Sequence, residues 1–127
     1  KLDNFIAERQ KWAEYYRDNL KDVDWLQLPE FPATGRHAWQ AFVMTVDPDK
    51  APMPRNDIMD HLKTKGIATR PGTHAVHMLG FYKDKYGIKE DDFPAAKDCN
   101  NNKLAIPLHN KMEAEDYQYI VDVIKSL

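Results

Sequence analysis

The pair of histidines at positions 74 and 77 has the spacing that most suggests chemistry in this sequence. On a helix, residues three apart share a face, so both imidazoles would point the same way. A zinc site needs a third and a fourth ligand, and neither an HExxH motif nor a cysteine partner accompanies the pair. His61 and His109 are more distant histidines that no spacing selects. We therefore expect no metal site, although the pair alone leaves one open.

Nucleophilic catalysis finds no better support. Cys99 is the only cysteine and precedes three asparagines, with no sequence signal for a reactive thiolate. Ser126 is the only serine, which argues against a Ser-His-Asp arrangement. The five glycines are scattered, so no GxGxxG or GxxxxGK[ST] loop could cradle a phosphate. Residue chemistry alone therefore predicts no self-sufficient active site and no catalytic residue.

The composition is that of an ordinary globular domain, and 127 residues suffice for one domain with a real core. A formal net charge of -2 argues against nucleic acid or an anionic membrane as a partner. No stretch approaches the roughly 18 apolar residues of a membrane-spanning helix, and no signal peptide opens the chain. With a single cysteine, these features predict a cytoplasmic protein. The chain starts at Lys1 rather than Met and enters a helical pattern at once, so we expect a longer parent, although a processed chain would look the same.

Apolar periodicity predicts the elements that must position any site. A stripe from Phe5 to Leu20 indicates an amphipathic helix, and an irregular connector follows with Pro29, Pro32 and Gly35. The aromatic and β-branched run at 36–47 predicts a strand. A second helix is expected at 56–65, closed by Gly66 with Ile67 against Leu62.

The second half predicts shorter elements. We expect an extended segment at 67–70, a turn at Pro71-Gly72, and a helix over 74–86 that packs through Val76, Leu79 and Tyr82 or Tyr86. Next come a short helix after Phe93-Pro94, a strand at 104–108 placed at a sheet margin by Pro107, and a last helix around 117–124. The aromatic residues Trp12, Tyr16, Trp39 and Tyr117 are better explained by core packing than by stacking on bases or glycans. The order predicts an α/β (α+β) domain in which helices cover a small sheet.

Read in order, several segments resemble the C-terminal part of the DegT/DnrJ/EryC1/StrS aminotransferases. The helix WAEYYRDNL (12–20) is similar to the "R..A..Y...L" helix of the family, LPEFP (28–32) follows, and RHAWQAFVM (36–44) is similar to its "HaW..yvi" strand. LKTKGIATRP (62–71), with His77 and Tyr82 after it, resembles the "L...GI.TRP" and "H..P.Y" segments of the perosamine-synthase-like branch. FPAA (93–96), LAIPLH (104–109) and EDY (115–117) complete the series.

The resemblance implies a single domain over residues 1–127, with the small, mainly antiparallel sheet of the C-terminal domain of fold-type I enzymes. It implies a parent that moves an amino group from an amino acid such as glutamate to a keto-sugar nucleotide, for polysaccharide or amino-sugar synthesis. Pyridoxal phosphate would be held by the large domain of the same chain, in a parent that is a homodimer, and not by this segment. Lysines such as Lys63, Lys65, Lys83 and Lys103 lie in polar stretches and are interpreted as surface charges.

In this family the small domain closes over the active site, so the resemblance makes residues 69–77 the candidate contact with the sugar nucleotide. Arg70 could pair with a substrate phosphate, or form an interdomain salt bridge. His74 or His77 could donate to a sugar hydroxyl or phosphate oxygen, while packing or helix capping is the alternative for His77. The sequence departs from the family pattern in two places. The family usually has a proline between the histidine and the tyrosine, whereas this sequence has Leu79-Gly80-Phe81 there. Glu113 stands where Ser or Thr usually caps the final helix.

Two other functions stay open: a stand-alone module that binds a nucleotide sugar or a protein through residues 69–77, and a folded scaffold with interaction surfaces. If a large domain adjoins this one, part of the surface should expose an apolar patch.

Overall fold

The first helix, α1 (Leu2–Leu20), forms where the apolar stripe predicted it. Its buried residues Ala13, Tyr16 and Leu20 all lie in the second half, whereas Phe5 is 48% exposed. The stripe therefore faces the core only along the C-terminal part of the helix. The computed structural model describes residues 1–31 and 34–127, and Pro32 of the predicted connector lies outside the described residues.

A four-stranded antiparallel sheet occupies the centre of the described part of the chain. Its strands are β1 (Leu26–Gln27), β2 (Phe42–Val46), β3 (Arg70–Pro71) and β4 (Lys103–Ile106), in the order β1-β2-β4-β3. Along β2 the burial alternates, with Phe42, Met44 and Val46 turned into the core. The predicted class, helices covering a small antiparallel sheet, is confirmed.

The strand predicted at 36–47 is wrong in its first half. Trp39 has a φ of 47°, a left-handed conformation that no strand tolerates, and its N–H donates to Nδ1 of His37 at 2.9 Å. Arg9 of α1 donates to the carbonyl oxygens of Trp39 and Gln40, so this segment bonds to a helix instead of a neighbouring strand. Trp39 is nevertheless buried, as predicted.

The strand predicted at 104–108 is confirmed in type but its placement at the margin is wrong. β4 is an inner strand that pairs with β2 on one side and with β3 on the other. Pro107 follows the last residue of β4, so the sheet never needs the N–H that proline lacks.

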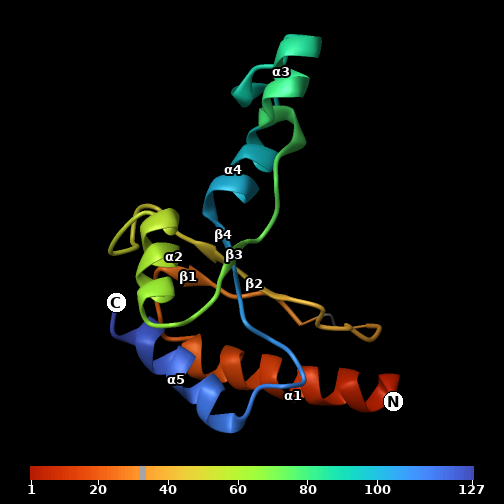
Figure 1. The fold of residues 1–127 in the computed structure, drawn as a ribbon, viewed down its shortest axis with the longest axis vertical. Coiled ribbons are helices and arrows are strands. Elements are labelled where there is room, and N and C mark those ends of the chain that lie inside the picture. Colours follow the sequence, from red (N-terminus) through yellow and green to blue (C-terminus); the bar gives the residue numbers. More distant parts are fainter. Residues whose placement is uncertain (32–33) are drawn as a thin grey trace.

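Helices α2 (Arg55–Thr64) and α5 (Ala114–Lys125) complete the body. Figure 1 shows α5 beside α1 below the sheet, and these two helices are in contact. Glu113, which departs from the family pattern, does not leave α5 uncapped, because its N–H donates to Oδ2 of Asp116 at 2.9 Å. Within the described residues, no helix combines the length and apolar character needed to cross a membrane.

Residues 73–102 form an arm that projects from the body at the top of Figure 1. It contains the 3-10 helices η1 (Val76–Met78) and η2 (Glu90–Asp92) and the α-helices α3 (Gly80–Tyr86) and α4 (Pro94–Asn102). The single helix predicted at 74–86 is wrong, because the backbone of Leu79 is extended and separates η1 from α3. Its expected packing side is exposed: Val76, Leu79, Tyr82 and Tyr86 are 52%, 50%, 36% and 59% accessible.

Candidate functional site

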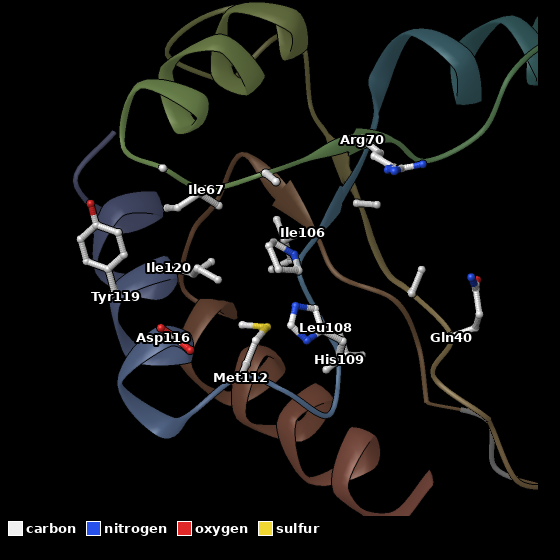
Figure 2. A pocket seen from close by; sticks show the side chains of 15 residues that line it. Gln40, Ile67, Arg70, Ile106, Leu108, His109, Met112, Asp116, Tyr119 and Ile120 are labelled. Atoms are coloured by element: carbon white, nitrogen blue, oxygen red, sulfur yellow. The ribbon is translucent and has the colours of Figure 1, made fainter. Parts of the chain in front are cut away.

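A pocket of about 550 Å³ lies between β3, the end of β4 and helix α5 (Figure 2). Its walls are mainly apolar and include Ile67, Ile106 and Ile120. Polar side chains also line it: Gln40, Arg70, His109, Asp116 and Tyr119. An apolar hollow with a few polar groups around it is the usual form of a small-molecule site.

The end of α2 determines how Arg70 reaches this pocket. Gly66 has a φ of 77°, its N–H donates to Lys63 O at 3.0 Å, and the N–H of Ile67 donates to Leu62 O at 2.9 Å. This is the predicted Schellman closure, and it turns Ile67 into the core. The chain then enters β3, and Figure 2 shows Arg70 on that side of the pocket.

Two buried tyrosines hold the opposite wall in place. The hydroxyl of Tyr16 on α1 donates to Pro107 O at 2.8 Å, and the hydroxyl of Tyr117 on α5 donates to His109 O at 3.1 Å. Both acceptors belong to the connection between β4 and α5 that lines the pocket. The two hydrogen bonds therefore fix the backbone that carries His109.

The charges around the pocket favour an anion near β3. Arg70 is exposed, and no carboxylate of residues 1–31 or 34–127 lies within ion-pair distance of it. Asp116 already accepts the N–H of Glu113 in the first turn of α5, on the far side of the pocket from Arg70 in Figure 2. A guanidinium without a partner beside an apolar hollow suits a ligand with a phosphate or carboxylate at one end.

The structure does not bring the three predicted site residues together in this pocket. Arg70 lines it, whereas His74 and His77 do not. His74 is exposed on the way into the arm. His77 is buried in η1, where its Nε2 lies 3.1 Å from Glu90 O and its ring packs on Phe93 with centroids 5.0 Å apart.

Sequence reasoning did not select His109 or Asp116 for a small-molecule site. His109 appeared only as a distant histidine without a spacing signal, and Asp116 only as part of the EDY segment (115–117). The one available signal was the position of His109 directly after a buried strand, because side chains that follow strands often line sites. Its approach to β3 depends on the tertiary fold.

A cofactor aldehyde would need a lysine in a desolvated or cation-rich environment. Every lysine in the described part of the chain is exposed or half-buried, and none lines the pocket. Lys97 bonds to Asp91 at 2.7 Å, and this hydrogen bond raises the pKa of Lys97, opposite to the shift that a Schiff-base lysine needs. Pyridoxal phosphate therefore does not fit the lysines of this domain.

Metal ligands are not gathered either. Among the described residues, no group of three or more His, Cys, Asp or Glu side chains is placed to hold a metal ion. Cys99 is a half-buried free thiol on α4 and does not line the pocket.

Curated proteins similar to this chain include two biosynthesis proteins about three times its length. The spore coat polysaccharide biosynthesis protein SpsC of Bacillus subtilis is 29% identical over all of this chain and 33% of its own length. The erythromycin biosynthesis sensory transduction protein EryC1 of Saccharopolyspora erythraea is 27% identical over 98% of this chain and 32% of its own. The chain thus spans about a third of the relatives it matches.

Solved structures share the fold. The putative sugar aminotransferase Spr1654 from Streptococcus pneumoniae superposes with a TM-score of 0.86 at 20% identity, covering 98% of this chain and 31% of its own. The aminotransferase TlmJ from Streptoalloteichus hindustanus gives 0.83 at 21% identity, covering 98% and 32%. The model of the DegT/DnrJ/EryC1/StrS aminotransferase family matches residues 1–125. Because that match covers nearly the whole chain, this protein belongs to the DegT/DnrJ/EryC1/StrS aminotransferase family.

Proposed function

We propose that residues 1–127 form the C-terminal small domain of a pyridoxal-phosphate-dependent aminotransferase. The whole protein would move an amino group from an amino acid such as glutamate to a keto-sugar nucleotide in the cytoplasm, for polysaccharide or amino-sugar synthesis. The observation that carries the proposal is the family match over residues 1–125, in a chain that covers only a third of its relatives.

The cofactor belongs in the part of the protein outside residues 1–127. Pyridoxal phosphate, where bound, supplies the electron sink for amino transfer. The positions of the lysines support this division, since every lysine in the described part of the chain is exposed or half-buried. Spr1654 has been solved in forms named for PLP and PMP, and DesI in the presence of its TDP-sugar product. These names support a similar cofactor and a nucleotide sugar for this protein.

Within the domain, we assign substrate contact first to Arg70. It is the exposed guanidinium at an apolar pocket, and a planar fork suits a phosphate better than an ammonium does. His74 is exposed and stays a candidate donor. His77 is already engaged with Glu90 O and Phe93, so it is the weakest of the three. The segment LKTKGIATRP (62–71) supports a perosamine-synthase-like branch.

The test is amino transfer by the full-length polypeptide that contains these residues. The protein is incubated with pyridoxal phosphate, glutamate and a panel of nucleotide-linked 3-keto and 4-keto sugars. We expect it to form 2-oxoglutarate and an amino-sugar nucleotide, which mass spectrometry detects. Binding of these nucleotides without any amino transfer would instead favour the stand-alone module.

Arg70 variants of the same full-length protein sharpen this test. Arg70→Ala should raise KM for the sugar nucleotide about tenfold to a hundredfold, the loss expected for a charge-assisted hydrogen bond. The half-reaction with glutamate should be unchanged, Arg70→Lys should recover part of the loss, and Lys63→Ala, a surface change away from the pocket, should have no effect. If Arg70→Ala lowers the unfolding temperature but leaves KM alone, the arginine is an interdomain ion pair instead.

A further inference from the structure

The outer part of the arm, formed by α3 and η2, buries no side chain within the described residues. A seven-residue helix such as α3 is only marginally stable in water, because helix nucleation is unfavourable and most helical stability in proteins comes from tertiary packing. The segment from Gly80 to Tyr86 therefore needs a surface to pack against.

Three exposed aromatic rings of this segment contact one another in series. Phe81 is 65% and Tyr86 59% exposed. The rings of Phe81 and Tyr82 are 5.2 Å apart, and those of Tyr82 and Tyr86 are 6.2 Å apart. Together with Leu79, these residues form what we call the arm face, defined as Leu79, Phe81, Tyr82 and Tyr86. Large exposed apolar groups in contact with one another mark an interaction surface.

The arm satisfies several of its own charges. Lys83 pairs with Glu90 at 2.8 Å, and Lys97 pairs with Asp91 at 2.7 Å. The pKa values of both carboxyl groups are lowered, chiefly by these hydrogen bonds. Lys85 is outside these pairs, and its ammonium lies 5.3 Å from the ring centroids of both Phe81 and Tyr86. The arm face therefore combines aromatic rings with one cation, which suits a protein surface.

The base of the arm is tied down, so the face is presented at a defined place. The guanidinium of Arg55 on α2 donates to three carbonyl oxygens at the end of α4, and Asn100 Oδ1 accepts the N–H of Ala75 at 3.0 Å. Gly72 passes so close to β2 and β4 that a Cβ there would lie 2.5 Å from Val43 and 2.6 Å from Lys103. Figure 1 shows the resulting arm pointing away from the body.

We infer that the arm face docks on the large domain of the same polypeptide, outside residues 1–127. This rests on the proposed function, which supplies that domain. About two thirds of each curated relative lies outside the matched region, which is ample for a covering domain. Tethering in one chain gives an effective concentration on the order of millimolar, so a modest face suffices.

Hydrogen exchange in the full-length protein tests the docking. The backbone N–H groups of residues 83–87 include those that close α3, among them Lys83 to Leu79 O and Gly87 to Lys83 O. We expect these amides to exchange at least about tenfold more slowly than in an undocked helix, at every protein concentration. The double variant F81S/Y86S should abolish that protection and leave α5 unchanged. Because both side chains are exposed here, the body should fold normally.

Phe5→Ser is the matched control, since it removes another exposed aromatic side chain from α1 rather than from the arm. It should leave exchange in residues 83–87 as in the wild type. Fast exchange of these amides in the wild-type protein, equal to that of F81S/Y86S, would overturn the docking. Protection that grows with protein concentration would also overturn it, because the occupant would then be a second copy. Protected amides without amino transfer would contradict the proposed function but not the docking. Amino transfer with unprotected amides would contradict the docking but not the proposed function.

Discussion

At the scale of single residues, the hydroxyl groups of Tyr16 and Tyr117 connect the core to the pocket. Each donates to a carbonyl oxygen of the β4–α5 connection, Tyr16 to Pro107 and Tyr117 to His109. Burial raises the pKa of both hydroxyl groups, and that of Tyr117 to about 12. In the unfolded chain both hydroxyl groups lose their protons near pH 10, which for Tyr117 is about two pH units below its pKa in the folded protein. Ionisation therefore favours unfolding at high pH.

The free energy of unfolding should therefore fall as the pH rises above about 10, since the folded state then binds more protons than the unfolded state. Tyr16→Phe should lower that free energy by about 1 to 2 kcal/mol at neutral pH, because Pro107 O loses its donor. The same variant should show a shallower decline at alkaline pH. Urea denaturation at a series of pH values from about 7 to about 11.5 measures both effects. An identical alkaline decline in both proteins would exclude Tyr16 as its source.

At the scale of elements, the arm depends on one buried arginine. Arg55 contacts Asn101 O at 3.0 Å through Nε, Asn100 O at 2.7 Å through Nη2 and Lys103 O at 3.2 Å through Nη1. A cation is favourable at the carboxyl end of a helix, here α4. Desolvation lowers the pKa of Arg55 without bringing it near neutrality, since a guanidinium stays protonated in proteins.

Arg55→Met should destabilise the protein by about 1.5 to 3 kcal/mol, the range for a lost charged hydrogen bond, and should speed amide exchange in residues 94–103 more than in α5. Arg55→Lys should restore only part, because an ammonium cannot span three carbonyl oxygens as the guanidinium fork does. The surface pair of Arg36 with Asp3 provides the control. Arg36→Met should cost less than about 1 kcal/mol, as exposed ion pairs do. Equal losses in both variants would show that Arg55 has no special role at the base of the arm.

At the scale of the whole molecule, the described residues form a packed body with a projecting arm, but they supply no buried lysine to hold pyridoxal phosphate. The body buries a continuous core between sheet and helices, while the described lysines all lie at or near the surface. In the proposed enzyme the lysine that binds pyridoxal phosphate therefore lies outside residues 1–127.

Reduction of the full-length holoenzyme with borohydride should fix the cofactor to a single lysine, since the link between cofactor and lysine is reducible. Peptide mapping is expected to place that label outside this domain, and Lys83→Arg and Lys97→Arg should leave labelling unchanged. A labelled peptide from residues 1–127 would refute the assignment of the cofactor to the large domain.

The sequence alone determined helices α1, α2 and α5, the strand type of two segments, and the family. Apolar spacing along α1, α2 and α5 reflects helical periodicity, and Gly66 marks the end of α2, because both are local properties of the chain. The ordered series of family segments predicted the aminotransferase family, which the match over residues 1–125 confirms.

Only the tertiary structure decided which segments meet. β4 is an inner strand because β3, about 35 residues upstream, returns to pair with it, and no local pattern encodes that pairing. The strand predicted at 36–47 begins only at Phe42, because Arg9 on α1 bonds to the backbone of Trp39 and Gln40. For the same reason Arg70 shares a pocket with His109 and not with His77, although His77 is nearer in sequence. Contacts between distant segments depend on how the packed elements close around the core, and spacing along the chain does not contain that information.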